Sequence, residues 1–311
     1  MLKISGLFEP PQEMLDILNR KVSEYYAGVV LFLHQRNRRR RAEKGEDLSH
    51  SDRIIEECLK YTSIPRDPKG ETLVFRLPLL LSNWKYLTPE KKKLLYQWFK
   101  EELIEDSIEV RINALSADPS VFGMYNFETN IMEVAIHKYD VAYLNQFKYG
   151  LHINQTTAKH ELIHALQFIL TKLTRLDRKK NIAGLPPKNV RKKDIDLYGR
   201  KDKTKSMPDT HHMLRDIEFY TNLTDEVNDY LFFANYERTP KMKEQLAKLW
   251  IGSENMYNKL KQHLLDTAKQ EPAQVVYSIR PFFMKLKNHD PERYQKAVKV
   301  FWNEINKKIN F

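Results

Sequence analysis

Residues 160–164 place two imidazoles and a carboxylate within one short segment, His-Glu-Leu-Ile-His. Side chains four residues apart lie on the same face of a helix, so His160 and His164 can reach a single ion. Zinc binds imidazole nitrogens in tetrahedral sites. A carboxylate beside the His pair is suited to take a proton from an activated water. The spacing therefore predicts a Zn2+ site with His160 and His164 as ligands and Glu161 as general base.

The helix phase supports this prediction. With His160 at 0° and about 100° per residue, His164 falls at about 40° and Glu161 at about 100°. If the opposite face packs on a core, the His pair faces a cleft. The apolar residues of the segment cluster at about 160–240°, and they are Ala158, Leu162, Ala165, Leu166, Ile169 and Leu173.

Strands and further helices must position this segment. Thr156 or Thr157 is expected to cap the motif-bearing helix, which should run to about Leu173. Alternating apolar residues predict strands over residues 73–77, 108–112, 122–127 and 131–136, with a tight hairpin at 128–130. Other helices are predicted over residues 12–62 (with a loop or exposed helix end at 36–51), 88–105, from Thr210 or Thr224 to Ala234, 242–268 and 291–309, and a long loop over 177–208.

These elements predict an α+β fold, in which a small mixed sheet and an active-site helix are flanked by N- and C-terminal helical segments. We expect a mainly helical region over residues 1–105, a catalytic core over 106–235 and a C-terminal helical subdomain over 236–311. The apolar content of 41% suffices for a sizeable core. Cys58 is the single cysteine, which excludes an intramolecular disulfide and a Cys-rich zinc site.

The net charge of +11 is clustered along the chain. The segment from Lys172 to Lys205 contains 13 Lys or Arg and four Asp, and the segment from Arg36 to Arg41 contains five arginines. Clustered charge predicts an acidic partner or a nucleic acid at these two regions. No apolar run approaches the roughly 20 residues of a membrane span, and residues 1–11 lack an apolar signal region. A cytoplasmic protein without a membrane partner is therefore expected.

A strand hairpin followed by a His-Glu-x-x-His helix resembles the zincin metallopeptidases, and the resemblance covers residues 122–173. It implies a zincin-like fold and a zinc metallopeptidase that hydrolyses protein or peptide substrates, with Glu161 as the base. It also implies that the strand before the helix, residues 131–136, is the sheet edge that pairs with an extended substrate.

The third ligand is not given by the motif itself. Position 170 is Leu, so the metzincin pattern is absent, and the chain instead resembles the gluzincin branch, in which a downstream acidic residue completes the site. Glu218 is the preferred candidate because its apolar neighbours predict burial, and a buried carboxylate requires a partner. The open alternatives are Asp216, His212, His211 and Glu226, and Asn222 stands where a second-shell Asp is expected.

Supporting roles are assigned less directly. Tyr220 is the candidate catalytic donor to the oxyanion, with His211, His212 and Arg215 as alternatives. Asp216 is a candidate hydrogen-bond partner that orients a ligand His.

The alternative function is a catalytically inactive, HExxH-bearing protein that binds nucleic acid or belongs to a phage or virion structure. The chain loosely resembles predicted metallopeptidases encoded by bacteriophages in residues 216–220, which would imply a virion-associated location.

Overall fold

The computed structural model describes residues 9–62, 72–79, 89, 93, 107–113, 122–126, 129–136, 144–180, 216–252 and 282–309. The chain forms two compact bodies, one of residues 9–187 and one of residues 188–311 with 1–8. Seven helices and a mixed four-stranded sheet in these ranges confirm the α+β class. None of the helices in the described ranges combines the length and apolarity that a membrane span needs.

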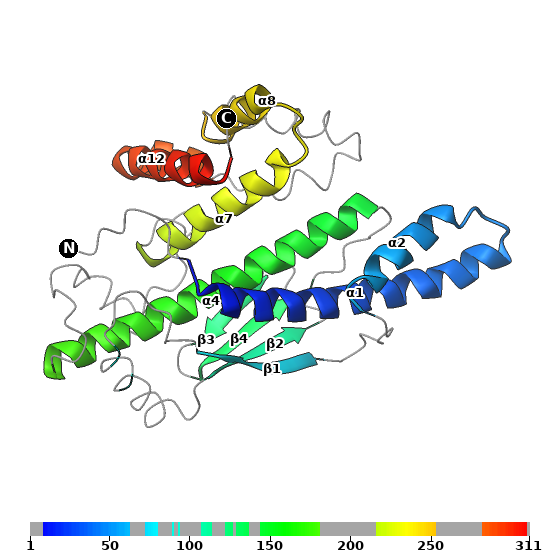
Figure 1. Cartoon of the computed structure of the whole chain (residues 1–311), viewed down its shortest axis with the longest axis horizontal. Coiled ribbons are helices and arrows are strands. Elements are labelled where there is room, and N and C mark those ends of the chain that lie inside the picture. Colours follow the sequence, from blue (N-terminus) through cyan, green and yellow to red (C-terminus); the bar gives the residue numbers. More distant parts are fainter. Residues whose placement is uncertain are drawn as a thin grey trace. The chain divides into compact units, whose positions relative to one another are not determined.

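A helical hairpin begins the first body (Figure 1). α1 spans Gln12–Glu43 and α2 spans Ser49–Leu59, which confirms the helical prediction for most of residues 12–62. The arginines near residue 40 belong to the exposed end of α1. Leu18 and Val22 are fully buried on α1, as is Cys58 on α2.

The sheet has the order β1-β2-β4-β3 and all four predicted strands are confirmed. β1 (Thr72–Pro78) and β2 (Ser107–Asn113) are antiparallel, β2 and β4 (Ile131–Ala135) are parallel, and β3 (Gly123–Asn126) and β4 are antiparallel. Figure 1 shows the sheet beside α1 and the long helix α4 (Leu144–Lys180).

The expectation that residues 131–136 form the sheet edge is wrong. β4 is internal, because it pairs with β2 on one side and with β3 on the other. The hairpin adds β3 outside β4, so among the described strands β3 is the edge on this side of the sheet. Strand order depends on a pairing between distant segments, which the alternation of apolar residues does not report.

The start predicted for the motif-bearing helix is also wrong. α4 begins at Leu144, so Thr156 and Thr157 are buried interior positions instead of caps. Burial of Phe147 and Leu151 continues the apolar face toward the N-terminus, and this packing outweighs the capping preference of threonine. The helix also extends past Leu173 to Lys180, so the predicted loop can begin no earlier than residue 181, and its remainder lies outside the described residues.

The N-terminal helices and the sheet belong to one body. Gln155 Nε2 of α4 donates to Ser23 Oγ of α1 at 2.8 Å, and the ring centroids of Tyr26 and Phe147 are 5.4 Å apart. α1, α2 and the four strands all lie within residues 9–187, which form one compact body.

In the second body the structure describes α7 (Asp216–Ala234), α8 (Pro240–Trp250), α11 (Phe282–His289) and α12 (Pro291–Lys308). Their shared core includes Tyr230, whose ring lies 5.9 Å from Trp250 and 5.3 Å from Phe301. Thr239 and Asp290 cap α8 and α12, and a proline follows each cap.

These helices confirm the predicted end of α7 at Ala234 and the C-terminal helix over residues 291–309. The single helix predicted over residues 242–268 is wrong, because α8 ends at Trp250 and a turn follows at residues 251–252. Residues 253–268 lie outside the described residues. Of the helix predicted for residues 88–105, only Pro89 and Lys93 are described, and both are helical.

Candidate metal centre

The two predicted imidazole ligands face one another on α4. Nε2 of His164 lies 3.1 Å from Nε2 of His160, and both side chains are half-buried. Two nitrogens at about 2.0–2.1 Å from a tetrahedral ion are about 3.3 Å apart. The 3.1 Å spacing of the two nitrogens is therefore close to that of two ligands of one ion, and it is also a hydrogen-bond distance.

The opposite face of α4 packs in the core, as the helix phase predicts. Ala158, Leu162, Ala165 and Leu166 are all fully buried. This packing fixes the rotation of α4 and so the direction of the His pair, because a helix with one face in the core cannot turn about its axis.

Gln167 lies beside one of the two predicted ligands. Nδ1 of His164 lies 3.1 Å from Oε1 of Gln167, an acceptor. A neutral imidazole carries its proton on one nitrogen only, so in the tautomer with the proton on Nδ1 this nitrogen donates to Gln167 and Nε2 keeps its lone pair. This is the tautomer that binds a metal through Nε2, with its outer nitrogen held by a neighbour.

Glu161 lies against the edge strand of the sheet. Its side chain is buried, and a Cβ built on Gly123 of β3 would lie 2.9 Å from its Cγ and 3.0 Å from its Oε1. The same Cβ would lie 2.8 Å from Cγ2 of Thr157. Only glycine permits this approach of β3 to α4.

Glu218 is buried on α7, as its apolar neighbours predict. Nδ2 of Asn222 donates to the Glu218 carbonyl oxygen at 2.8 Å and lies 3.5 Å from Oε2 of its carboxylate. Asn222 thus contacts the candidate ligand in the position where the resemblance implies an Asp.

His160, His164 and Glu218 form a group that could hold a metal ion, because one ligand atom of each lies within 4.8 Å of the others. Two imidazole nitrogens and one carboxylate oxygen are ligands that zinc accepts. That these three residues bind zinc stays a prediction.

No protein-family model matches the chain, and comparisons with curated proteins and with solved structures give no match.

The other predicted site residues have different outcomes. Glu226 is buried, and its Oε2 accepts a 2.7 Å hydrogen bond from Nε1 of Trp250, which gives this carboxylate a role inside the second body. Tyr220 is half-buried, and its ring lies 5.0 Å from Nζ of Lys296. The part of Tyr220 in stabilising an oxyanion stays a prediction. His211, His212, Arg215 and the side chain of Asp216 lie outside the described residues.

Sequence reasoning missed Gly123 and Gln167. The available signals were a glycine at the first position of a strand, which indicates close backbone approach, and an amide three residues after a ligand His on the same helix. Neither signal specifies a partner until the strand order and the helix rotation are known.

Proposed function

We propose that the chain is a zinc-dependent metallopeptidase whose metal is held by His160, His164 and Glu218. The observation that carries this proposal is the 3.1 Å separation of the two Nε2 atoms, with a carboxylate oxygen in the same group. The donor set of two imidazoles and one carboxylate leaves one position of a tetrahedral ion for water or substrate.

When bound, zinc would supply a Lewis acid that lowers the pKa of water toward neutrality. Glu161 takes a proton from the attacking water on its carboxylate and passes it to the leaving amine. Gln167 keeps His164 in the ligand tautomer throughout, because it holds the Nδ1 proton.

The edge strand β3 is the proposed contact for an extended substrate, in place of residues 131–136. Support comes from Gly123, which brings β3 against the side chain of Glu161. A peptide added to this edge would form backbone hydrogen bonds beside the proposed base, and extended peptides commonly bind in this way.

Metal analysis of purified variants tests the proposal. The wild-type chain should bind about one zinc, and the double variant His160→Ala/His164→Ala should bind none at this centre. Glu161→Gln should keep the zinc and the fold, and should lose hydrolysis of an internally quenched peptide library. Full zinc occupancy in the double His variant, or unchanged hydrolysis by Glu161→Gln, would contradict the proposal.

A further inference from the structure

The arginines at the end of α1 fall on two faces of the helix. At about 100° per residue, with Arg36 at 0°, Arg38 and Arg41 lie at about 200° and 140°. Arg39 and Arg40 lie at about −60° and 40°, beside Arg36. The run of arginines is therefore divided into an inner pair and an outer group of three.

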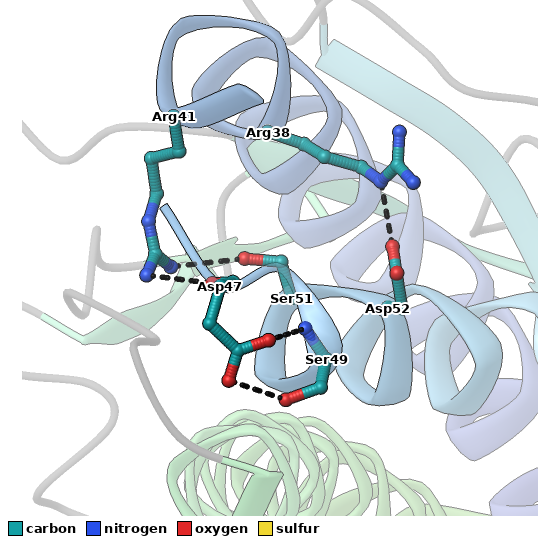
Figure 2. A network of polar contacts seen from close by, with 6 residues as sticks. All are labelled: Arg38, Arg41, Asp47, Ser49, Ser51 and Asp52. Carbon is teal, nitrogen blue, oxygen red and sulfur yellow. Dashed lines mark hydrogen bonds and ion pairs between the residues drawn. The ribbon is translucent and has the colours of Figure 1, made fainter. Parts of the chain in front are cut away.

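The inner pair binds the helical hairpin together. Arg38 Nε donates to Asp52 Oδ1 at 2.6 Å, and Arg41 donates to Ser51 Oγ and to the Asp47 carbonyl oxygen, both at 3.2 Å (Figure 2). Arg41 also pairs with Glu46 at 2.7 Å. These contacts explain two arginines as structural residues that join α1 to the start of α2.

Asp47 completes the connection between the helices. Its carboxylate accepts hydrogen bonds from the backbone nitrogen and the hydroxyl of Ser49, each at 2.9 Å (Figure 2). These bonds to Ser49, and to a smaller extent the charge of Arg41, lower the pKa of Asp47. The two acidic residues of the connection are thus already bound within the hairpin, Glu46 by Arg41 and Asp47 by Ser49.

The outer group is Arg36, Arg39 and Arg40, and all three side chains are exposed. Within the part of the chain that the structure describes, none of the three forms an ion pair or a hydrogen bond through its side chain. Glu43 is the acidic residue of the same face, and Lys44 follows it at the helix end. The outer group therefore presents three guanidinium groups on a face with one carboxylate, Glu43, with which none of the three forms an ion pair.

Guanidinium groups match phosphate in geometry, because two parallel N–H groups can bind two oxygens. Arg36 and Arg40 are separated by about 6 Å along the helix axis, at about 1.5 Å per residue. Successive phosphates of one nucleic-acid strand are separated by about 3.4 Å along its axis, so Arg36 and Arg40 span about two phosphate steps. A membrane-binding helix needs large apolar side chains exposed beside its basic residues. From Arg36 to the helix end the outer face has none, and Phe32 and Leu33, one turn earlier on the same face, are half-buried.

We infer that Arg36, Arg39 and Arg40 form a docking surface for the phosphate backbone of a nucleic acid, without base specificity. This inference is independent of the proposed peptidase activity, because it uses no residue of the metal centre. Arg38 and Arg41 contribute to this surface only indirectly, because they join α1 to α2 and so stabilise the hairpin that carries the outer group.

The experiment compares two variants that each lose three positive charges. Arg36→Gln/Arg39→Gln/Arg40→Gln removes the outer group. The control, Arg238→Gln/Lys241→Gln/Lys299→Gln, removes exposed charges of the second body. Binding of the full chain to a fluorescent 20-base-pair DNA duplex is measured by anisotropy from about 50 to 200 mM salt. Thermal unfolding of both variants is followed in parallel, because Arg40 also lies in the favourable last turn of a helix.

The outer variant should bind DNA at least about tenfold more weakly than wild type, and its slope of log affinity against log salt should be smaller by about 2 to 3. The control variant should keep most of the wild-type slope. Equal slopes for the wild type and the outer variant would overturn the inference. So would an equal loss in both variants, because that result reports net charge alone. A variant that loses binding to anionic lipid vesicles while keeping DNA binding would assign the surface to a membrane and overturn the inference as well.

Discussion

His164 depends on a neighbour for its chemical form. Gln167 accepts from Nδ1, so removal of its amide leaves the imidazole free to change tautomer and to rotate. We expect Gln167→Ala to weaken zinc affinity by about tenfold or more, as is usual for partners of ligand histidines. Competition with a chelator of known affinity measures this change. Gln167→Glu retains an acceptor and should restore most of the affinity, whereas equal affinity of the Ala variant and the wild type would remove the assigned role.

Glu218 provides the oxygen ligand of the proposed centre. Glu218→Ala should lower zinc affinity by at least about tenfold, because it removes one of three protein ligands. Glu226→Gln is the matched control, since this carboxylate is on the same helix and accepts from Trp250 instead. The control should keep its zinc affinity even where its melting temperature falls. An Asp216→Ala variant that loses more zinc than Glu218→Ala would transfer the ligand role to Asp216.

At the scale of elements, the contact between β3 and α4 depends on one missing side chain. A methyl group on Gly123 would lie 2.8 Å from Cγ2 of Thr157 and 2.9 Å from Cγ of Glu161, closer than carbon atoms pack. We expect Gly123→Ala to destabilise the chain by about 1–3 kcal/mol, as overpacking does. Urea denaturation measures this difference.

A second substitution separates overpacking from other effects of alanine. Thr157→Ser removes the nearest methyl group, so Gly123→Ala/Thr157→Ser should recover part of the lost stability. The remaining clash involves Glu161, and the double variant should therefore still lose peptide hydrolysis. Strictly additive losses in the double variant would show that the close approach is not what Gly123 provides.

The elements differ in how well the sequence predicts them. Local signals sufficed for β2 and β4, whose apolar residues alternate, and for α12, where Asp290 and Pro291 cap and begin the helix. Local signals failed for the start of α4, because burial of Phe147 and Leu151 outweighs the capping preference of the threonines. They also failed for the sheet edge. Its position depends on the parallel pairing of β2 with β4, two strands that are not consecutive in the sequence.

The same distinction applies to the candidate site. The spacing of His160 and His164 on one helix is local, so the sequence predicts their approach. Burial of Glu218 follows from its apolar neighbours, and this burial favours it as third ligand. The expectation that a downstream acidic residue completes the site comes from the resemblance. Gly123 and Gln167 act through contacts that exist only after the strand order and the helix rotation are set, and no pattern in the sequence names their partners.

At the scale of the whole molecule, the net charge of +11 has consequences that depend on its distribution. Two arginines of the α1 end are used inside the hairpin, whereas three remain on its outer face. Counting charges along the sequence does not separate these roles. Variants that change charge must therefore be chosen by helix face and not by position in the run.

The reactivity of the single thiol of the chain can report how often the first body opens. Cys58 is fully buried on α2, and burial, with a smaller contribution from Glu57, raises the pKa of its thiol to about 12. An unfolded cysteine ionises near pH 8.5. Stability linked to this group is therefore complete below about pH 8.5 and falls as the pH rises toward the folded value. Reaction with a thiol-specific dye at neutral pH should be slow and should follow the opening of this body, and rapid native labelling would contradict the buried position. Because no second cysteine competes for the dye, one unmodified protein sample can report separately on how often its helical hairpin and sheet come apart.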